Sequence, residues 1–191
     1  AMIGCLVGSE MCIRDRVDLG EATASDARDG VIVPSVDNSG PFPPGPNSVV
    51  WSASDRSGNT VEAIQKVDVI PLISLGGSAE VTEGGSGFIV IGLNGAAVQY
   101  PVSARLEVMG DAQAPQDHDL VDQTVEISEG EQVSIPFSLV DDGAGEGPET
   151  FTVRLVEPSG ASLSAISELA VTISERNVAP IVSIELSQQG V

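Results

Sequence analysis

Short segments in which apolar and polar residues alternate run through the chain from Val17 onward, separated by clusters of Gly, Pro, Asn and Asp. No stretch of ten residues keeps the 3.6-residue period of an amphipathic helix. The alternation is clearest in Val102 to Val108, Val133 to Leu139, Phe151 to Leu155 and Leu169 to Ile173. Each such strand buries one face and leaves the other in water. The sequence therefore predicts an all-β chain built from antiparallel β-sandwiches.

The composition excludes several classes of function. The 191 residues include 28 acidic and 8 basic ones, for a net charge of −20. A nucleic-acid binder needs clustered cations to neutralise phosphates, so we expect no nucleic-acid partner. With two cysteines and one histidine, the chain holds little material for thiol or imidazole chemistry, and we expect no enzyme activity. No apolar run approaches the roughly 18 residues of a membrane helix.

Residues 1–16 are predicted to be an artefact outside the fold. The stretch from Leu6 to Arg16 reads LVGSEMCIRDR and resembles the translated adapter of a transposase-based sequencing library. Cys12 lies inside this stretch and Cys5 beside it, so neither cysteine informs on disulfides or compartment. We therefore expect a metagenomic fragment cut at both ends. Its net charge without these residues is still −20, because they carry two acidic and two basic residues.

A first domain is predicted over residues 17–70, with a boundary near Ile70 and Pro71. Residues 48–54 and 60–70 read as two strands, joined by a turn of Asp, Arg, Ser, Gly and Asn at 55–59. A Pro-rich approach at 40–47 precedes them. Trp51 in the first of these strands is interpreted as a core anchor, with stacking on a ligand as the alternative.

Residues 41–70 resemble the C-terminal part of a hyalin-repeat domain, an immunoglobulin-like module of extracellular proteins. The resemblance lies in the Pro-Gly approach, the strand end Val-x-Trp-x-Ala-x-Asp, the Ser-Gly-Asn turn and the final strand. It implies an adhesion or spacer role without catalytic residues. Together with the pattern of the following segment, it predicts tandem immunoglobulin-like antiparallel β-sandwiches.

Residues 71–177 form the second predicted domain, with strands near 79–83, 87–93, 100–108, 123–127, 132–139, 150–156 and 168–174. Pro136 suggests an edge strand or a bulge. If successive strands alternate in direction, every second connection meets at one end of the sandwich. That end then gathers most of the carboxylates: Glu83, Asp111, Asp117, Asp119, Asp122, Asp141, Asp142, Glu146, Glu149 and Glu175. The other end holds Glu129, Glu131 and Glu157. Crowded carboxylates repel one another, so their gathering at the first end needs an explanation. Either the loops there are solvated, or a hard cation such as Ca²⁺ binds among the carboxylates. Carboxylates without His or Cys argue against zinc.

The same segment resembles a Calx-β domain over essentially its whole length. Val81 to Gly87 resembles the opening Glu-Gly turn and strand of that family, and Asp117 to Leu120 its Asp-Tyr region. The most specific stretch is Asp141 to Phe151, DDGAGEGPETF, which resembles the paired aspartates followed by Glu-x-x-Glu-x-Phe. The resemblance implies a Ca²⁺ site with metal ligands Glu83, Asp119, Asp141, Asp142, Glu146 and Glu149. Weaker candidates are the Ala144 carbonyl, Asp117 and Glu175.

The chain departs from the family pattern after the last strand. Where members that bind several ions carry an aspartate run, this sequence reads Glu175-Arg176-Asn177. We expect Arg176 to repel a nearby cation, so one ion is predicted and a second is doubtful. His118, flanked by Asp117 and Asp119, is interpreted as an exposed loop residue.

The predicted function is a non-catalytic, calcium-binding module of a large extracellular or cell-surface, adhesin-like protein, in which Ca²⁺ stiffens the joint between modules. Residues 178–191 read as a linker and the first strand of a further module. The expected partners are neighbouring sandwich modules of the same chain, and cell-surface proteins or glycans. The alternatives are a passive spacer without metal and an accessory module of a secreted enzyme.

Overall fold

The computed structural model describes residues 17–143 and 147–176, which form fourteen strands and no helix. The all-β class predicted from the alternating pattern is therefore confirmed. Two compact units are present. One contains the described residues up to Pro71 together with Gly95–Gln99, and the other contains Leu72–Asn94 together with the described residues from Tyr100 onward. Within the described ranges, no helix is long and apolar enough to cross a membrane.

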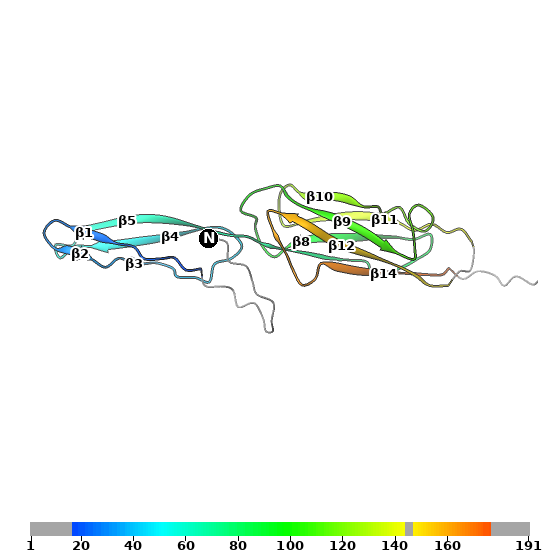
Figure 1. Ribbon diagram of the computed structural model, residues 1–191, viewed down its shortest axis with the longest axis horizontal. Coiled ribbons are helices and arrows are strands. Elements are labelled where there is room, and N and C mark those ends of the chain that lie inside the picture. The colour runs from blue at the N-terminus through cyan, green and yellow to red at the C-terminus, as the bar shows by residue number, and fades with distance from the viewer. Residues whose placement is uncertain (1–16, 144–146, 177–191) are drawn as a thin grey trace, which may run out of the picture. The chain divides into compact units, whose positions relative to one another are not determined.

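The first unit has two small antiparallel sheets. Strand β1 (Ala24–Asp26) pairs with β2 (Gly30–Ile32), and β4 (Gly45–Ser54) lies between β3 (Ser35–Val36) and β5 (Thr60–Val69), as Figure 1 shows. The predicted turn at 55–59 joins β4 to β5, where the Asp55 carboxylate accepts hydrogen bonds from the main-chain and side-chain N–H groups of Asn59 at 2.7 and 2.6 Å. These bonds explain why Asp and Asn stand at the two ends of this turn.

A small core holds the first unit together. Phe42, Val49 and Val67 are its buried members, and Trp51 packs against them. The indole N–H of Trp51 donates a 2.8 Å hydrogen bond to Gln65 Oε1 on the neighbouring strand. A tryptophan with its ring on the core and its one donor satisfied is a structural anchor, as predicted.

The second unit is a sandwich of two sheets. One sheet has the order β10 (Gln123–Ile127), β9 (Val102–Gly110), β12 (Glu149–Ser159), β14 (Glu168–Ser174) and β7 (Glu80–Thr82). The other has the order β11 (Gln132–Ser138), β8 (Ser86–Leu93), β6 (Leu72–Gly77) and β13 (Ser162–Leu163). The pairings are antiparallel except for β7 with β14 and β6 with β13, which are parallel. The predicted antiparallel sandwich is therefore present, with two short parallel pairs that the sequence did not indicate.

The core of this unit consists of the inward residues of the predicted alternating segments. Along β12 the pattern is regular, since Phe151, Val153 and Leu155 are all buried while the residues between them are not. Strands β8, β9 and β14 follow the same rule. Pro136 lies in β11, which pairs only with β8 and is therefore an edge strand, as its proline indicated.

The prediction missed two strands of the second unit, as well as the short strands β1, β2 and β3 of the first unit. Strand β13 has only two residues and carries no periodic signal. Strand β6 does have a periodic signal, because the buried residues Ile73 and Leu75 alternate with the more exposed Leu72 and Ser74. The strand was not predicted because it begins next to the expected domain boundary at Ile70 and Pro71. Strands β6 and β7 run in the same direction but belong to different sheets, so the chain passes from one sheet to the other between them. The extra strand β6 therefore does not change the end of the sandwich at which each later connection lies.

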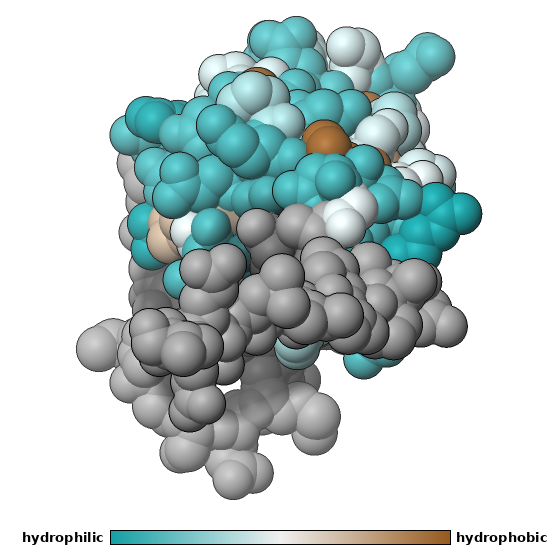
Figure 2. All heavy atoms as spheres, turned by 90° about the vertical axis from the view of Figure 1, so that its right-hand side faces the viewer, coloured by the Kyte–Doolittle hydropathy of each residue, from teal (hydrophilic) through white to brown (hydrophobic). Residues whose placement is uncertain are grey.

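The registers place the connections at two ends, as the alternation predicted. At one end lie the paired residues Ser86 and Ser138, Gly110 and Phe151, and Thr82 and Ser174. At the opposite end lie Leu93 and Ile73, and Ile127 and Val102. We call the first the acidic end, because Glu83, Asp111, Asp117, Asp119, Asp122, Asp141, Asp142, Glu149 and Glu175 follow or precede the strands there. Figure 2 looks onto this end, and the described residues that it shows are mostly hydrophilic, with a few apolar ones between them.

Candidate metal centre

Three glutamates continue the inward face of three neighbouring strands at the acidic end. Glu149 begins β12 two residues before the buried Phe151. Glu175 follows the buried Ile173 of β14 by two residues, and Glu83 follows the inward Val81 of β7 in the same way. All three glutamates are half-buried. The alternation that builds the core therefore places carboxylates where the core ends on β12, β14 and β7. Glu83 and Glu175 follow the paired residues Thr82 and Ser174, while Glu149 lies level with Ile173.

Glu83 is the most constrained of these side chains. Its main-chain N–H donates to the Ser174 carbonyl at 3.1 Å, which extends the pairing of β7 with β14 by one residue. Its Oε2 atom is buried and has no hydrogen-bond partner among the described residues. Burial, followed by the charge of Glu175, raises the pKa of Glu83 above its ordinary value, and Asp142 and Asp141 act in the same direction. The charges of three carboxylates on two other segments of the chain therefore act on Glu83.

Asp141 and Asp142 reach this cluster from the other sheet, just after β11. Asp141 Oδ2 lies 2.6 Å from Nη1 of Arg176, and its Oδ1 accepts the main-chain N–H of Gly143 at 3.2 Å. Arg176 also donates its main-chain N–H to the Glu83 carboxylate, which lowers the pKa of Glu83 against the larger raising effects. Glu175 Oε1 accepts the Gly147 N–H at 2.7 Å. The guanidinium of Arg176 thus pairs directly with Asp141, one of the predicted metal ligands. A cation that approached Asp141 would therefore meet the positive charge of Arg176.

Asp119 and Asp117 hold the loop between β9 and β10 in place. Asp119 Oδ1 accepts the Ser138 N–H at 2.7 Å, and its own N–H donates to the Ser138 carbonyl at 3.2 Å. Asp117 Oδ2 accepts the Gln113 N–H at 2.6 Å. The Ser138 bond satisfies a main-chain donor on the open side of edge strand β11, a group that would otherwise face solvent. One oxygen of each aspartate is thus used in local structure.

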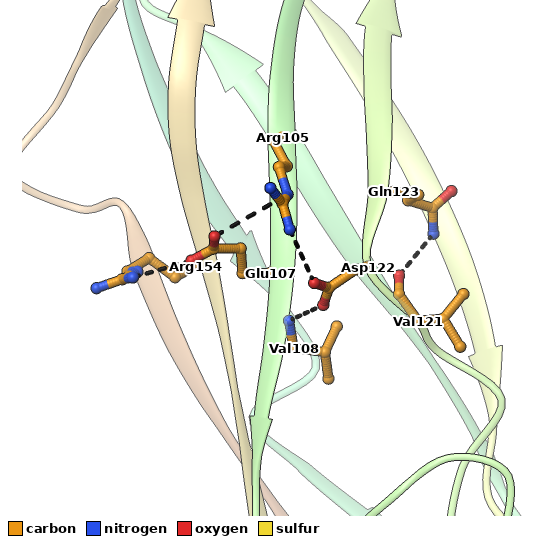
Figure 3. A network of polar contacts seen from close by, with 7 residues as sticks. All are labelled: Arg105, Glu107, Val108, Val121, Asp122, Gln123 and Arg154. Atoms are coloured by element: carbon orange, nitrogen blue, oxygen red, sulfur yellow. Dashed lines mark hydrogen bonds and ion pairs between the residues drawn. The ribbon is translucent and has the colours of Figure 1, made fainter.

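Asp122 belongs to a separate network on the five-stranded sheet, drawn in Figure 3. Its Oδ1 accepts the Val108 N–H at 2.8 Å, and its Oδ2 pairs with Arg105 at 3.3 Å. These two contacts lower the pKa of Asp122, the Val108 bond most. Arg105 also lies 4.0 Å from Glu107, which pairs at 2.9 Å with Arg154. Local cations therefore neutralise part of the acidic surface.

His118 is buried, and the prediction that it is exposed was wrong. It is 1% exposed, and its ring centroid lies 4.2 Å from that of Phe151. The reason is local alternation, because His118 and Leu120 turn inward while Asp119 between them is exposed. Both ring nitrogens lack a hydrogen-bond partner among the described residues. His118 also lines a hollow of about 440 Å³ together with Met109 and Leu120.

The donor chemistry of the cluster fits a hard cation, while its arrangement is not that of a preformed metal site. The donors at Glu83, Asp141, Asp142 and Glu175 are all carboxylate oxygens, the ligand type of Ca²⁺. Glu83 Oε2 is a buried oxygen that no described residue hydrogen-bonds. Within residues 17–143 and 147–176, no group of three or more candidate ligands is close enough together to hold a metal. The predicted ligands Glu146 and Ala144 lie outside the described residues, as do the segments 1–16 and 178–191.

The comparisons with known proteins give a likeness of fold. A crystal structure of the apo form of the Calx CBD1 domain is 21% identical, with a TM-score of 0.49, and the alignment covers 56% of this chain and 99% of that one. A crystal structure of CBD12 from CALX1.2 is 22% identical with a TM-score of 0.49, and one of the calcium binding domain CBD12 of CALX1.1 is 22% identical with a TM-score of 0.48. In each of these two, 54% of this chain aligns with 44% of the other. No family model matches the sequence, and no curated protein matches it.

Two residues near Glu83 have effects or contacts that the sequence pattern did not specify. Glu175 was only a weaker candidate, although its charge acts on Glu83 more strongly than those of Asp141 and Asp142. The signal was present, because Val171, Ile173 and Glu175 share one face of the strand. Arg176 was expected to repel a nearby cation, and its direct pairing with Asp141 could not be derived from spacing.

Proposed function

We propose that the second unit is a non-catalytic calcium-binding module whose ion is held at the acidic end by Glu83, Asp141, Asp142 and Glu175, with Glu149 beside them. Glu146 and the Ala144 carbonyl remain predicted ligands from the Calx-β resemblance. Asp119 and Asp117 each use one carboxylate oxygen to position the loop between β9 and β10. When bound, the ion would supply positive charge among oxygens that otherwise repel one another.

The observation that carries this proposal is the position of the Glu83 carboxylate. One of its oxygens is buried and has no hydrogen-bond partner in the described part of the chain, while the charges of three further carboxylates act on Glu83. Burying a charged oxygen without a partner costs free energy, and neighbouring like charges raise that cost. A divalent cation offsets both costs at once, whereas a purely solvated loop would not bury the oxygen. The sequence resemblance of Asp141 to Phe151 to the Calx-β pattern points to the same chemistry.

The setting we propose is a large extracellular or cell-surface protein made of tandem modules. The first unit supports a spacer role, because its residues serve a small core and a hairpin turn. The hyalin-like sequence of residues 41–70 agrees with this role. Because β14 ends at the acidic end, an ion there would lie where the chain leaves the second unit, and we propose that it stiffens the joint to a following module. Neighbouring modules, and surface proteins or glycans, are the proposed partners.

The test is a calorimetric titration of the full chain with CaCl₂. We compare the unaltered chain with a double variant, Asp141→Asn with Asp142→Asn, and with a matched control, Glu129→Gln with Glu131→Gln. The control removes the same charge from the opposite end of the same sandwich. We expect binding in the unaltered chain and the control, and an affinity at least tenfold weaker in the aspartate variant. Equal binding by all three proteins, or no heat at millimolar Ca²⁺, would refute the proposed site.

A passive spacer without metal is the second candidate, and the Arg176–Asp141 contact at 2.6 Å favours it. A guanidinium that neutralises Asp141 removes part of the need for a metal ion. Under this alternative, the melting temperature of the second unit would be the same in CaCl₂ and in chelator. The calcium-binding module instead requires a higher melting temperature in CaCl₂, because a ligand that binds only the folded state stabilises it.

A further inference from the structure

Arg176 contacts two of the proposed ligands through different parts of the residue. Its Nη1 atom lies 2.6 Å from Asp141 Oδ2, and its main-chain N–H donates to the Glu83 carboxylate. The side chain of Arg176 is 67% exposed, against 28% for Asp141. Burial therefore contributes little to holding the guanidinium in place. The contact with Asp141 is electrostatic, and another cation can compete for it.

The turn after Glu83 leaves room for this contact. Gly84 has a φ of +68°, in the left-handed region that glycine adopts at little cost. A Cβ at position 84 would lie 3.2 Å from Asp141 Cβ and 3.7 Å from Arg176 Nη1. A side chain there would crowd both partners of the ion pair. The turn that presents Glu83 to the cluster thus also allows Arg176 to lie against Asp141.

We infer that Arg176 is the resident counter-ion of the acidic cluster and that it sets the calcium affinity of the module by competing with the ion for Asp141. This inference rests on the proposed function. Without calcium, the guanidinium supplies one positive charge beside Asp141, near the carboxylates whose charges act on Glu83. A calcium ion that uses Asp141 must displace that charge or bind beside it. A divalent and a monovalent cation held about 6 Å apart in a water-like dielectric repel one another enough to weaken binding by about tenfold.

The experiment measures the Ca²⁺ dissociation constant of the full chain and of two charge-matched variants by calorimetry. Arg176→Gln removes the guanidinium charge but leaves the main-chain N–H that bonds Glu83. Arg105→Gln is the control, because it removes the same charge from an exposed arginine whose partners are Asp122 and Glu107, outside the cluster. We expect Arg176→Gln to bind Ca²⁺ about tenfold more tightly than the unaltered chain, and Arg105→Gln to bind within twofold of it.

The other outcomes separate this inference from the proposed function. If the unaltered chain binds and Arg176→Gln binds equally well or more weakly, the role of Arg176 is refuted and the calcium site stands. If only Arg176→Gln binds, Arg176 is the group that keeps the ion out, so the inference holds while the native chain is the passive spacer. If neither protein binds Ca²⁺ at 10 mM (a concentration of about this order would saturate even weak extracellular sites), both the inference and the proposed function are wrong.

Discussion

Replacing Asp119 separates a loop-positioning role from a metal-binding role. Asp119 Oδ1 accepts the Ser138 N–H at 2.7 Å, on the open edge of β11 and three residues before Asp141. A hydrogen bond to a charged group contributes about 1.5–3 kcal/mol, and a neutral one about 0.5–1.5 kcal/mol. Because this bond is exposed, water can replace part of it. We therefore expect Asp119→Ala to lower the free energy of unfolding of the second unit by about 1–2 kcal/mol, and Asp119→Asn by less than about 1 kcal/mol.

The assay is urea unfolding in chelator, followed by far-UV circular dichroism. Trp51 is the only tryptophan and lies in the first unit, so its fluorescence reports that unit separately. A loss of 1 kcal/mol corresponds to roughly 4 °C in melting temperature for a unit of this size. Asp111→Ala is the matched control, because Asp111 is exposed in the same loop and carries the same charge. We expect it to change stability by less than about 0.5 kcal/mol.

Two results would refute this reasoning. One is an Asp119→Ala variant as stable as the Asp111→Ala control, because the Ser138 bond would then contribute nothing. The other is a shift of the Trp51 transition as large as that of the second unit, because the effect would then not be local. In a Ca²⁺ titration, we expect Asp119→Asn to weaken binding by at most about threefold, much less than replacement of the aspartates of the cluster, since the charges that act on Glu83 come from Glu175, Asp142 and Asp141.

Two further predictions concern the cluster and the core beneath it. The raised pKa of Glu83 means that the folded state binds its proton more tightly than the unfolded state, so its contribution to stability is full below about pH 4.5 and is lost as the pH rises through the folded-state pKa. Glu83→Gln removes this loss, and calorimetric scans in chelator should show a higher melting temperature than that of the native chain at pH 7 and no increase at pH 4. A lower melting temperature at pH 7 would contradict this. Phe151 is fully buried, with its ring centroid 5.6 Å from that of Phe137 and 4.2 Å from that of His118. Phe151→Ala should therefore cost about 3–5 kcal/mol in urea unfolding of the second unit, while the Trp51 transition stays in place; a cost below 1 kcal/mol would show that the site collapses around the smaller side chain.

The strands whose apolar and polar residues alternate could be predicted from the sequence alone. The seven predicted strands of the second unit are all present, and their inward residues form its core, because alternation reports directly which face is buried. The sequence was insufficient where the signal is short or lies at a boundary. Strand β6 has only two buried residues, Ile73 and Leu75, beside the junction of the two units. His118 was misjudged for a related reason, since its charged neighbours concealed a local alternation with Leu120.

The candidate site was predictable in its location but not in its internal pairing. Counting connections assigned the carboxylates to one end, and the strand registers place them there. Whether a carboxylate faces another carboxylate, a main-chain donor or a cation depends on distances of a few ångströms between loops. No rule of sequence spacing gives such distances. Three aspartates of the acidic end show how different the partners can be. Asp119 accepts a main-chain N–H, Asp122 pairs with Arg105, and Asp141 pairs with Arg176.

The contrast between Asp122 and Glu83 explains why only part of a strongly acidic surface points to a metal ion. Asp122 is exposed, accepts a main-chain hydrogen bond and pairs with Arg105, so its charge is already stabilised and a metal ion would have to displace those contacts. Glu83 is half-buried, has an oxygen that no described residue hydrogen-bonds, and feels the charges of three carboxylates, so its own charge is destabilised. A cation that approaches a carboxylate like Glu83 therefore lowers the free energy of the protein, whereas a cation that approaches Asp122 lowers it little. The single positive charge of Arg176 reduces the repulsion among these carboxylates but does not cancel it, because several negative charges act there. The affinity for calcium is therefore expected to depend on how much repulsion Arg176 leaves uncompensated, rather than on the total charge of the chain.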